Sequence, residues 1–128
     1  MRLLVDTCTF LWLAADDPQL STPAKSACVD PSHDVFVSAI SAWEIAIKYR
    51  LGRLGLPEPP HTYVPDRRQK MRLDALDFDE LAAAHTHLLP AHHRDPFDRI
   101  IIAQAKVRDI PIVTNDSAFD GYGIGIMW

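Results

Sequence analysis

Residues 95–116, DPFDRIIIAQAKVRDIPIVTND, join a helix signal to a strand signal, and this pairing decides the fold. Asp95 followed by Pro96 is typical of a helix start, because Asp accepts from free backbone N–H groups and Pro fits the first helical position. The apolar residues that follow extend this helix until a second proline ends it. Residues 112–114, Ile-Val-Thr, then predict a short buried strand.

The same alternation of strands and helices runs through the rest of the chain. Further strands are expected at residues 3–5, 34–38, 73–76 and, at an edge, 124–127. Helices are expected at residues 10–15, 22–29, 41–51 and 77–89. Strands that alternate with helices pair in parallel. The sequence therefore predicts one domain over residues 1–128, an α/β fold with a three-layer α/β/α sandwich and a mainly parallel central sheet.

Two of these helix starts rest on capping pairs, and one segment stays ambiguous. Ser41 with Glu44 and Asp77 with Glu80 have the spacing at which a short polar side chain caps a helix and an acid returns the bond. Residues 61–73 fit neither a clear helix nor a clear strand.

Length and composition narrow the functional class. A chain of 128 residues with 48% apolar residues can bury a core without a disulfide or structural metal. Its formal charge of -4 argues against a protein that only coats nucleic acid, which is usually basic. Two cysteines without a CxxC motif fit a reducing compartment, and the apolar start of the chain is too short to span a membrane. We expect a cytoplasmic protein.

Four acidic residues fall where an open α/β sheet binds its ligands. Asp6 and Asp116 follow predicted strands, and Glu44 and Asp98 lie in the first turns of predicted helices. Ligands in such folds sit at the carboxyl ends of the strands, so these acids can converge on one edge. Taken singly, an Asp after a strand or Glu44 is better explained as a helix cap or turn former, and Asp98 can simply favour the helix start through the dipole. Asp95, three residues before Asp98, can be either the cap of this helix or a metal ligand.

Converging carboxylates predict a divalent metal. Clustered acids repel one another unless a cation neutralises them, and Mg²⁺ prefers oxygen ligands. One metal ion, or two about 4 Å apart, can activate water and stabilise the leaving oxygen of a phosphodiester. Hydrolysis of phosphodiester bonds is therefore the predicted reaction.

Four ordered stretches also resemble a known family: residues 1–21, 35–54 (VFVSAISAWEIAIKYRLGRL), 89–105 and 110–123. They resemble the PIN-domain ribonucleases, and most closely the VapC-type toxins of prokaryotic toxin–antitoxin pairs. The likeness runs from Leu3 to Trp128 and implies a metal-dependent endoribonuclease using Mg²⁺ or Mn²⁺. It also implies an RNA substrate, a homodimer and a cognate antitoxin protein.

The resemblance assigns roles to particular residues. By the family pattern the catalytic and metal-binding acids are Asp6, Glu44, Asp98 and Asp116, with Asp98 fitting the third position better than Asp95. Thr114 is implied as a hydroxyl partner of the fourth acid. Close relatives often carry a His where this chain has Cys8, which we interpret as a packed thiol.

Basic and aromatic residues supply candidates for RNA contact. The basic candidates are Lys48, Arg67, Arg68, Lys70, Arg72, Arg94 and Arg99. Phosphate contacts from such residues compete with a solvated helix face as the explanation. Trp12 and Trp43 are expected to pack in the core, with base stacking as the alternative. The histidines at 85, 87, 92 and 93 are expected to be structural or at the surface, with His92 or His93 near bound phosphate as the alternative.

Two rival functions remain to be weighed. A haloacid-dehalogenase-like enzyme needs an Asp-x-Asp pair after the first strand, but this chain has Asp6-Thr7-Cys8. A receiver domain needs a lysine after a late strand, and here that strand leads to Thr114-Asn115-Asp116. The second rival is a non-catalytic metal- or RNA-binding interaction module of the same fold. It would tolerate the loss of an acid, and all four acids are present.

Overall fold

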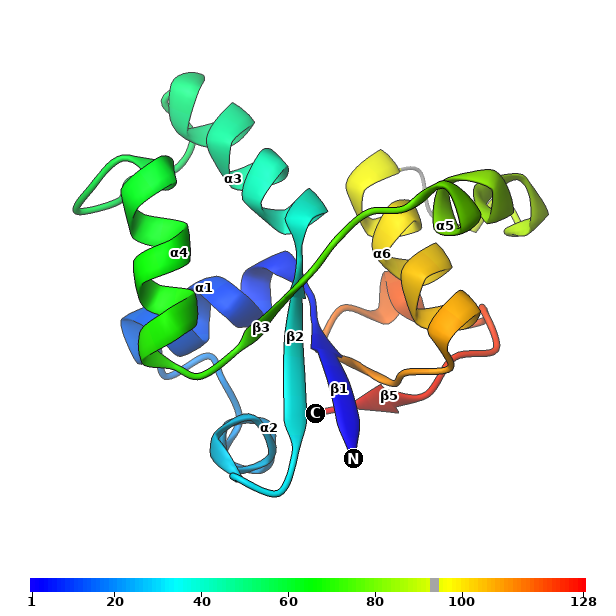
Figure 1. Cartoon of the computed structure of the whole chain (residues 1–128), viewed down its shortest axis with the longest axis horizontal. Coiled ribbons are helices and arrows are strands. Elements are labelled where there is room, and N and C mark those ends of the chain that lie inside the picture. Colours follow the sequence, from blue (N-terminus) through cyan, green and yellow to red (C-terminus); the bar gives the residue numbers. More distant parts are fainter. Residues whose placement is uncertain (93–94) are drawn as a thin grey trace.

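The computed structural model describes residues 1–92 and 95–128 and contains one sheet of parallel strands (Figure 1). The strand order is β3-β2-β1-β4-β5. The strands are β1 (Arg2–Val5), β2 (Asp34–Ser38), β3 (Asp74–Leu76), β4 (Ile112–Val113) and β5 (Ile126–Met127). All four pairings are parallel, which confirms the predicted sheet.

Helices cover both faces of the sheet. They are α1 (Thr7–Ala15), α2 (Thr22–Val29), α3 (Ala39–Arg50), α4 (Pro60–Lys70), α5 (Glu80–His85) and α6 (Pro96–Arg108), with short 3₁₀ helices η1 (Thr86–Leu88) and η2 (Ser117–Phe119). Leu3 and Val5 pack against α1, α2 and α4 in one core, while Leu4 packs against α6 in a second core. Because neighbouring strand residues point to opposite faces, β1 serves both cores, and the three-layer sandwich is confirmed.

Two helix-capping predictions were wrong, and the segment left ambiguous is now assigned. That segment contains the helix α4, which keeps Pro65 inside it. Asp79, rather than Asp77, caps α5 by accepting from the backbone N–H of Ala82. Several carboxylates in this segment have cap spacing, and the end of β3 decides which of them meets the free N–H groups.

The start of α3 also differs, and this difference matters for the site. Ser38 caps the helix by accepting from the N–H of Ile40, so α3 begins at Ala39. Ser41 and Glu44 therefore lie within the helix instead of at its end, and both are buried at 0% and 3% exposure. The predicted capping box is wrong, and a buried glutamate requires another explanation.

A buried amide ties α6 to the sheet. Gln104 has no exposed surface; its Oε1 accepts from Ser38 Oγ at 2.6 Å and its Nε2 donates to the Asp77 carbonyl at 3.2 Å. Since Ser38 also caps α3, this amide fixes α6 relative to α3.

None of the helices in the described ranges is long and apolar enough to cross a membrane.

Replacing Gln104 by Leu is expected to destabilise the fold by about 1–3 kcal/mol, because the Asp77 carbonyl and the Ser38 hydroxyl lose a buried partner. Urea denaturation measures this change. The matched control is Gln69→Leu on the exposed surface of α4, which is expected to change stability by less than about 0.5 kcal/mol. Equal effects of the two changes would show that the amide network contributes nothing.

Candidate active site

The register of the sheet brings three polar residues to one edge. Val5 pairs with Val37 on one side and with Val113 on the other. The next residues, Asp6, Ser38 and Thr114, therefore follow neighbouring strand ends at the carboxyl edge. In Figure 1, α1 and α3 both begin there. This is the edge at which open α/β sheets bind ligands.

Asp6 lies at the centre of this edge. Its Oδ1 accepts from the N–H of Thr9 at 2.8 Å and caps α1, while its Oδ2 accepts from Thr114 Oγ1 at 2.6 Å. The residue is 4% exposed, and burial raises the pKa of its carboxyl, with the charge of Asp116 adding to the rise and the hydrogen bonds opposing it. Both of these hydrogen-bond donors to Asp6 are uncharged, so an ionised Asp6 is held at a cost.

Glu44 is held from two sides. The Thr7 hydroxyl donates to Oε1 at 2.7 Å and lies 2.9 Å from Ser41 Oγ, and Lys48 Nζ lies 2.6 Å from Oε2. This pairing raises the pKa of Lys48, chiefly through the hydrogen bond to Glu44. Sequence analysis missed Thr7 as a partner of Glu44 and Ser41 as a partner of Thr7. The signal available was a threonine directly after the first acid, and only the packing of α1 on α3 gives it a role.

Asp95 and Asp98 take different positions at the start of α6. Asp95 caps the helix, since its Oδ1 accepts from the N–H groups of Phe97 at 2.9 Å and Asp98 at 3.4 Å. Asp98 is half-buried in the first turn. The predicted cap at Asp95 and the predicted placement of Asp98 are both confirmed.

The negative charges of three of the acids act on the Cys8 thiol. Burial, together with the charges of Asp6, Glu44 and Asp98, raises the pKa of this thiol to about 11. Cys8 is exposed, so its interpretation as a packed thiol is wrong, although burial of the thiol is the largest cause of the pKa shift. The thiol therefore stays neutral at pH 7, and it lies within electrostatic range of acids from β1, α3 and α6.

Asp116 stands further out. It is exposed, and its Oδ1 accepts from the N–H of Ala118 at 2.9 Å, which caps η2. Its own N–H donates to Thr114 Oγ1 at 3.1 Å, so Thr114 joins Asp116 to Asp6 through one hydroxyl. The carboxylate to which Thr114 donates is that of Asp6, whereas its contact with Asp116 is to the backbone N–H.

The donors at this edge suit a hard divalent cation, although they are not yet gathered around one. Carboxylate oxygens are the ligands that Mg²⁺ prefers, and a cation would offset the burial of Asp6. Within residues 1–92 and 95–128, no three acidic, histidine or cysteine side chains already form a metal-binding group. In this structure the cation held by Glu44 is the ammonium of Lys48.

Most of the predicted RNA-binding cations are occupied elsewhere. Arg67 pairs with Asp66 and with Glu58 and stacks over the Tyr63 ring, and Lys70 pairs with Asp66. Arg68 donates to the carbonyl of Leu73, and Arg99 to the carbonyls of Thr86, Leu89 and Pro90. Arg94 and His93 lie outside the described residues. Lys48 is therefore the predicted cation that the structure places against one of the acids.

Two residues of the basic cluster lie toward the other end of the sheet. Lys70 and Arg72 line a cavity of about 600 Å³ together with Asp34, the first residue of β2. The acids, in contrast, follow the carboxyl ends of the strands. The structure therefore does not bring Lys70 and Arg72 to the acidic edge.

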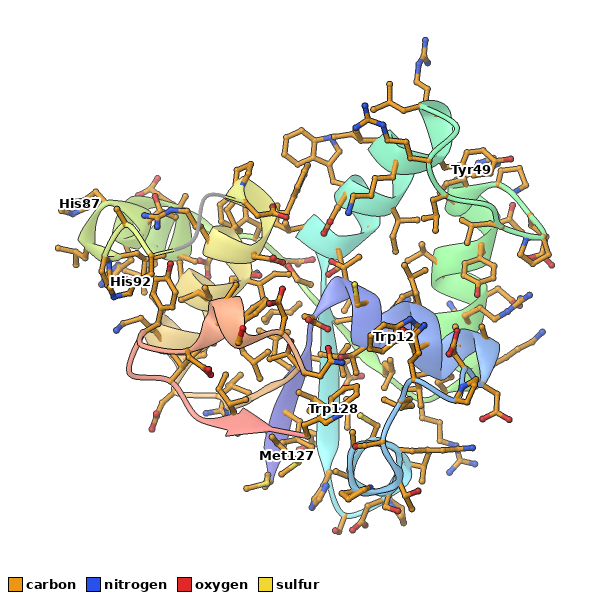
Figure 2. All side chains as sticks on the ribbon, turned by 180° about the vertical axis from the view of Figure 1, so that it is seen from behind. Trp12, Tyr49, His87, His92, Met127 and Trp128 are labelled. Atoms are coloured by element: carbon orange, nitrogen blue, oxygen red, sulfur yellow. The ribbon has the colours of Figure 1, made fainter. Side chains whose placement is uncertain are left out.

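The two tryptophans differ. Trp12 packs against the core and lies edge-on to Trp128, with ring centroids 5.9 Å apart, as Figure 2 shows. Trp43 was predicted to be buried, and this is wrong: it is 57% exposed on α3. His85 Nδ1 lies 2.9 Å from the Leu81 carbonyl and the His92 ring packs edge-on to Tyr122, so both make local contacts.

The protein is therefore a parallel α/β domain with acidic residues at the carboxyl edge of its sheet. These acids follow β1 or lie on α3 and α6. The PIN domain family model matches residues 3–124, and the chain belongs to this family.

Among known proteins, the chain is similar to Ribonuclease VapC16 of Mycobacterium tuberculosis, with 42% identity over 89 residues. That alignment covers 60% of this chain and 63% of the relative, so the match spans less than two thirds of the relative's length.

Solved structures show the same fold at low sequence identity. VapBC2 from Rickettsia felis, bound to a DNA fragment from its promoter, matches with a TM-score of 0.75 and 15% identity over 99% of this chain and 98% of that one. DNA-bound VapBC from Salmonella typhimurium matches with a TM-score of 0.71 and 24% identity over 99% and 97%.

Proposed function

We propose that this chain is a metal-dependent endoribonuclease that hydrolyses RNA phosphodiester bonds and acts as the toxin of a toxin–antitoxin pair. The observation that carries the proposal is that two of the acids are held together at the carboxyl edge of the sheet: Thr114 donates to Asp6, and Thr7, the next residue along, donates to Glu44. Membership of the PIN family and the likeness to a VapC ribonuclease support the choice of RNA as substrate.

In this proposal Asp6, Glu44, Asp98 and Asp116 hold Mg²⁺ or Mn²⁺, which supplies charge for activating water and stabilising the leaving oxygen. Thr114 orients Asp6, and Thr7 orients Glu44, because each donates to a carboxylate oxygen. Fixed acids need no reorganisation when charge develops at phosphorus.

Lys48 has a second task in the proposed reaction. Its ammonium balances Glu44 in the structure described and lies 47% exposed at the edge of the site. A cation at this position can contact a phosphate oxygen of the RNA strand. Of the cations predicted from sequence, Lys48 is the one we retain for this role.

The proposed partners follow from the similar proteins. Solved neighbours include VapBC from two organisms, both bound to DNA. We propose a cognate antitoxin and a homodimer for this chain, in the cytoplasm, where the free thiols of Cys8 and Cys28 stay reduced.

The test is cleavage of a mixed RNA pool by purified wild-type protein. Cutting is expected with Mg²⁺ or Mn²⁺, is expected to stop on chelation with EDTA, and is expected to return when the metal is restored. A protein that binds the pool and never cuts it at any metal concentration would instead be the non-catalytic interaction module.

A further inference from the structure

We propose that the indole of Trp43 is a stacking platform for a nucleobase of the RNA strand held at the acidic edge. This inference rests on the proposed function and deepens it, since it names the part of the substrate that the site recognises. Base-aromatic stacking tolerates any base, so the platform would place the strand without selecting its sequence.

The first argument is placement. Trp43 directly precedes Glu44 on α3, and its ring partner Phe97 directly precedes Asp98 on α6. The aromatic pair thus bridges the two helices that carry these acids. A base on the indole would lie one residue away from groups proposed to act on the phosphodiester.

The second argument is exposure. Trp43 is 57% exposed, whereas its neighbours Glu44 and Ile45 are 3% and 0% exposed. Leaving a large aromatic side chain in water forgoes the stabilisation that burial would give. The core of this protein does not use Trp43, so its apolar surface is available to a ligand.

The third argument is orientation. The Trp43 and Phe97 rings are 5.4 Å apart between centroids and inclined at 77°. With nearly perpendicular planes, Phe97 can cover at most one face of the indole. The contact braces the indole against rotation and leaves a flat face on which a base can stack.

The experiment measures binding separately from cutting. Short single-stranded RNA of mixed sequence and an abasic ribose-phosphate strand of equal length are titrated against the Asp98→Asn protein. The same titrations are made after adding Trp43→Leu or Trp43→Phe. Leu51→Ala is the matched control, because Leu51 is 60% exposed at the other end of α3.

Trp43→Leu is expected to raise the Kd for RNA about tenfold, within the roughly 5- to 150-fold range that stacking of one base implies. Trp43→Phe is expected to restore most of the affinity, and Leu51→Ala to change nothing. The abasic strand is expected to bind all variants alike, because it has no base to stack. Unchanged thermal melting of each variant checks the fold.

Equal RNA affinity of Trp43→Leu and its parent would overturn the platform. If that variant also loses self-association in sedimentation, Trp43 belongs to an interface between copies of the chain. Equal sensitivity of RNA and abasic strand to Trp43→Leu would also contradict stacking. Failure of the Asp98→Asn parent to bind RNA at all, with no cutting by wild type, would remove the proposed function together with this inference.

Discussion

Replacing Asp98 by Asn is expected to lower metal-dependent RNA cleavage at least about 100-fold, whereas Asp95→Asn is expected to leave it within a few-fold of wild type. Asp98 contributes negative charge beside Cys8 at the acidic edge, and Asn cannot supply that charge to a cation. The Oδ1 of Asp95 accepts hydrogen bonds from two backbone N–H groups, and Asn caps a helix as well as Asp does.

The pair is informative because both substitutions are isosteric and both fall at the start of α6. Initial rates on one RNA substrate, over a range of Mn²⁺ concentrations, measure the difference. Circular dichroism of both variants checks that α6 is intact. Loss of cutting in Asp95→Asn with retention in Asp98→Asn would reverse the assignment of the third acid. Survival of cutting in both would show that neither carboxylate is required and would contradict the proposed metal site.

Asp6→Asn is expected to abolish cutting and, without metal, to stabilise the fold at neutral pH. Burial raises the pKa of the folded carboxyl above its ordinary value. The stabilising contribution of such a group is complete below the unfolded pKa and is lost as pH rises through the folded pKa. At pH 7 ionised Asp6 is therefore a cost, which Asn avoids while Oδ1 still caps α1 for Thr9.

Chemical denaturation of wild type and of Asp6→Asn, at pH 7 and at lower pH, measures how far ionised Asp6 lowers the free energy of unfolding. The advantage of Asp6→Asn is expected to shrink as pH falls through the folded pKa, and Mg²⁺ or Mn²⁺ is expected to stabilise wild type alone. Asp34→Asn, at the exposed amino end of β2, is the control. Equal stabilisation of both proteins by metal would place the cation away from Asp6.

Local signals in the sequence were enough for the architecture. Alternating apolar runs and helix caps depend on neighbours a few residues apart, so Asp95-Pro96 marked the start of α6 and the strand before Asp116 marked β4. The sheet edge on which the acids fall followed from parallel pairing alone.

Boundaries with several eligible caps were not decided locally. Ser38 and Ser41 both suit the start of α3, as Asp77 and Asp79 suit the start of α5. The end of each preceding strand determines which side chain reaches the free N–H groups. A local pattern contains no measure of where that strand stops.

The sequence by itself determined the layers and the parallel sheet and supplied the four acids as candidates, because these depend on hydrophobic periodicity and on residue chemistry. Only the tertiary structure decided that Thr7 donates to Glu44, that Arg99 donates to a loop carbonyl, and that Trp43 is exposed to water. Each of these outcomes depends on how two helices pack, which joins residues far apart in the chain. Hydrophobic periodicity and residue spacing do not specify which distant residues come into contact. The surroundings of each acid are therefore known only from the packed helices.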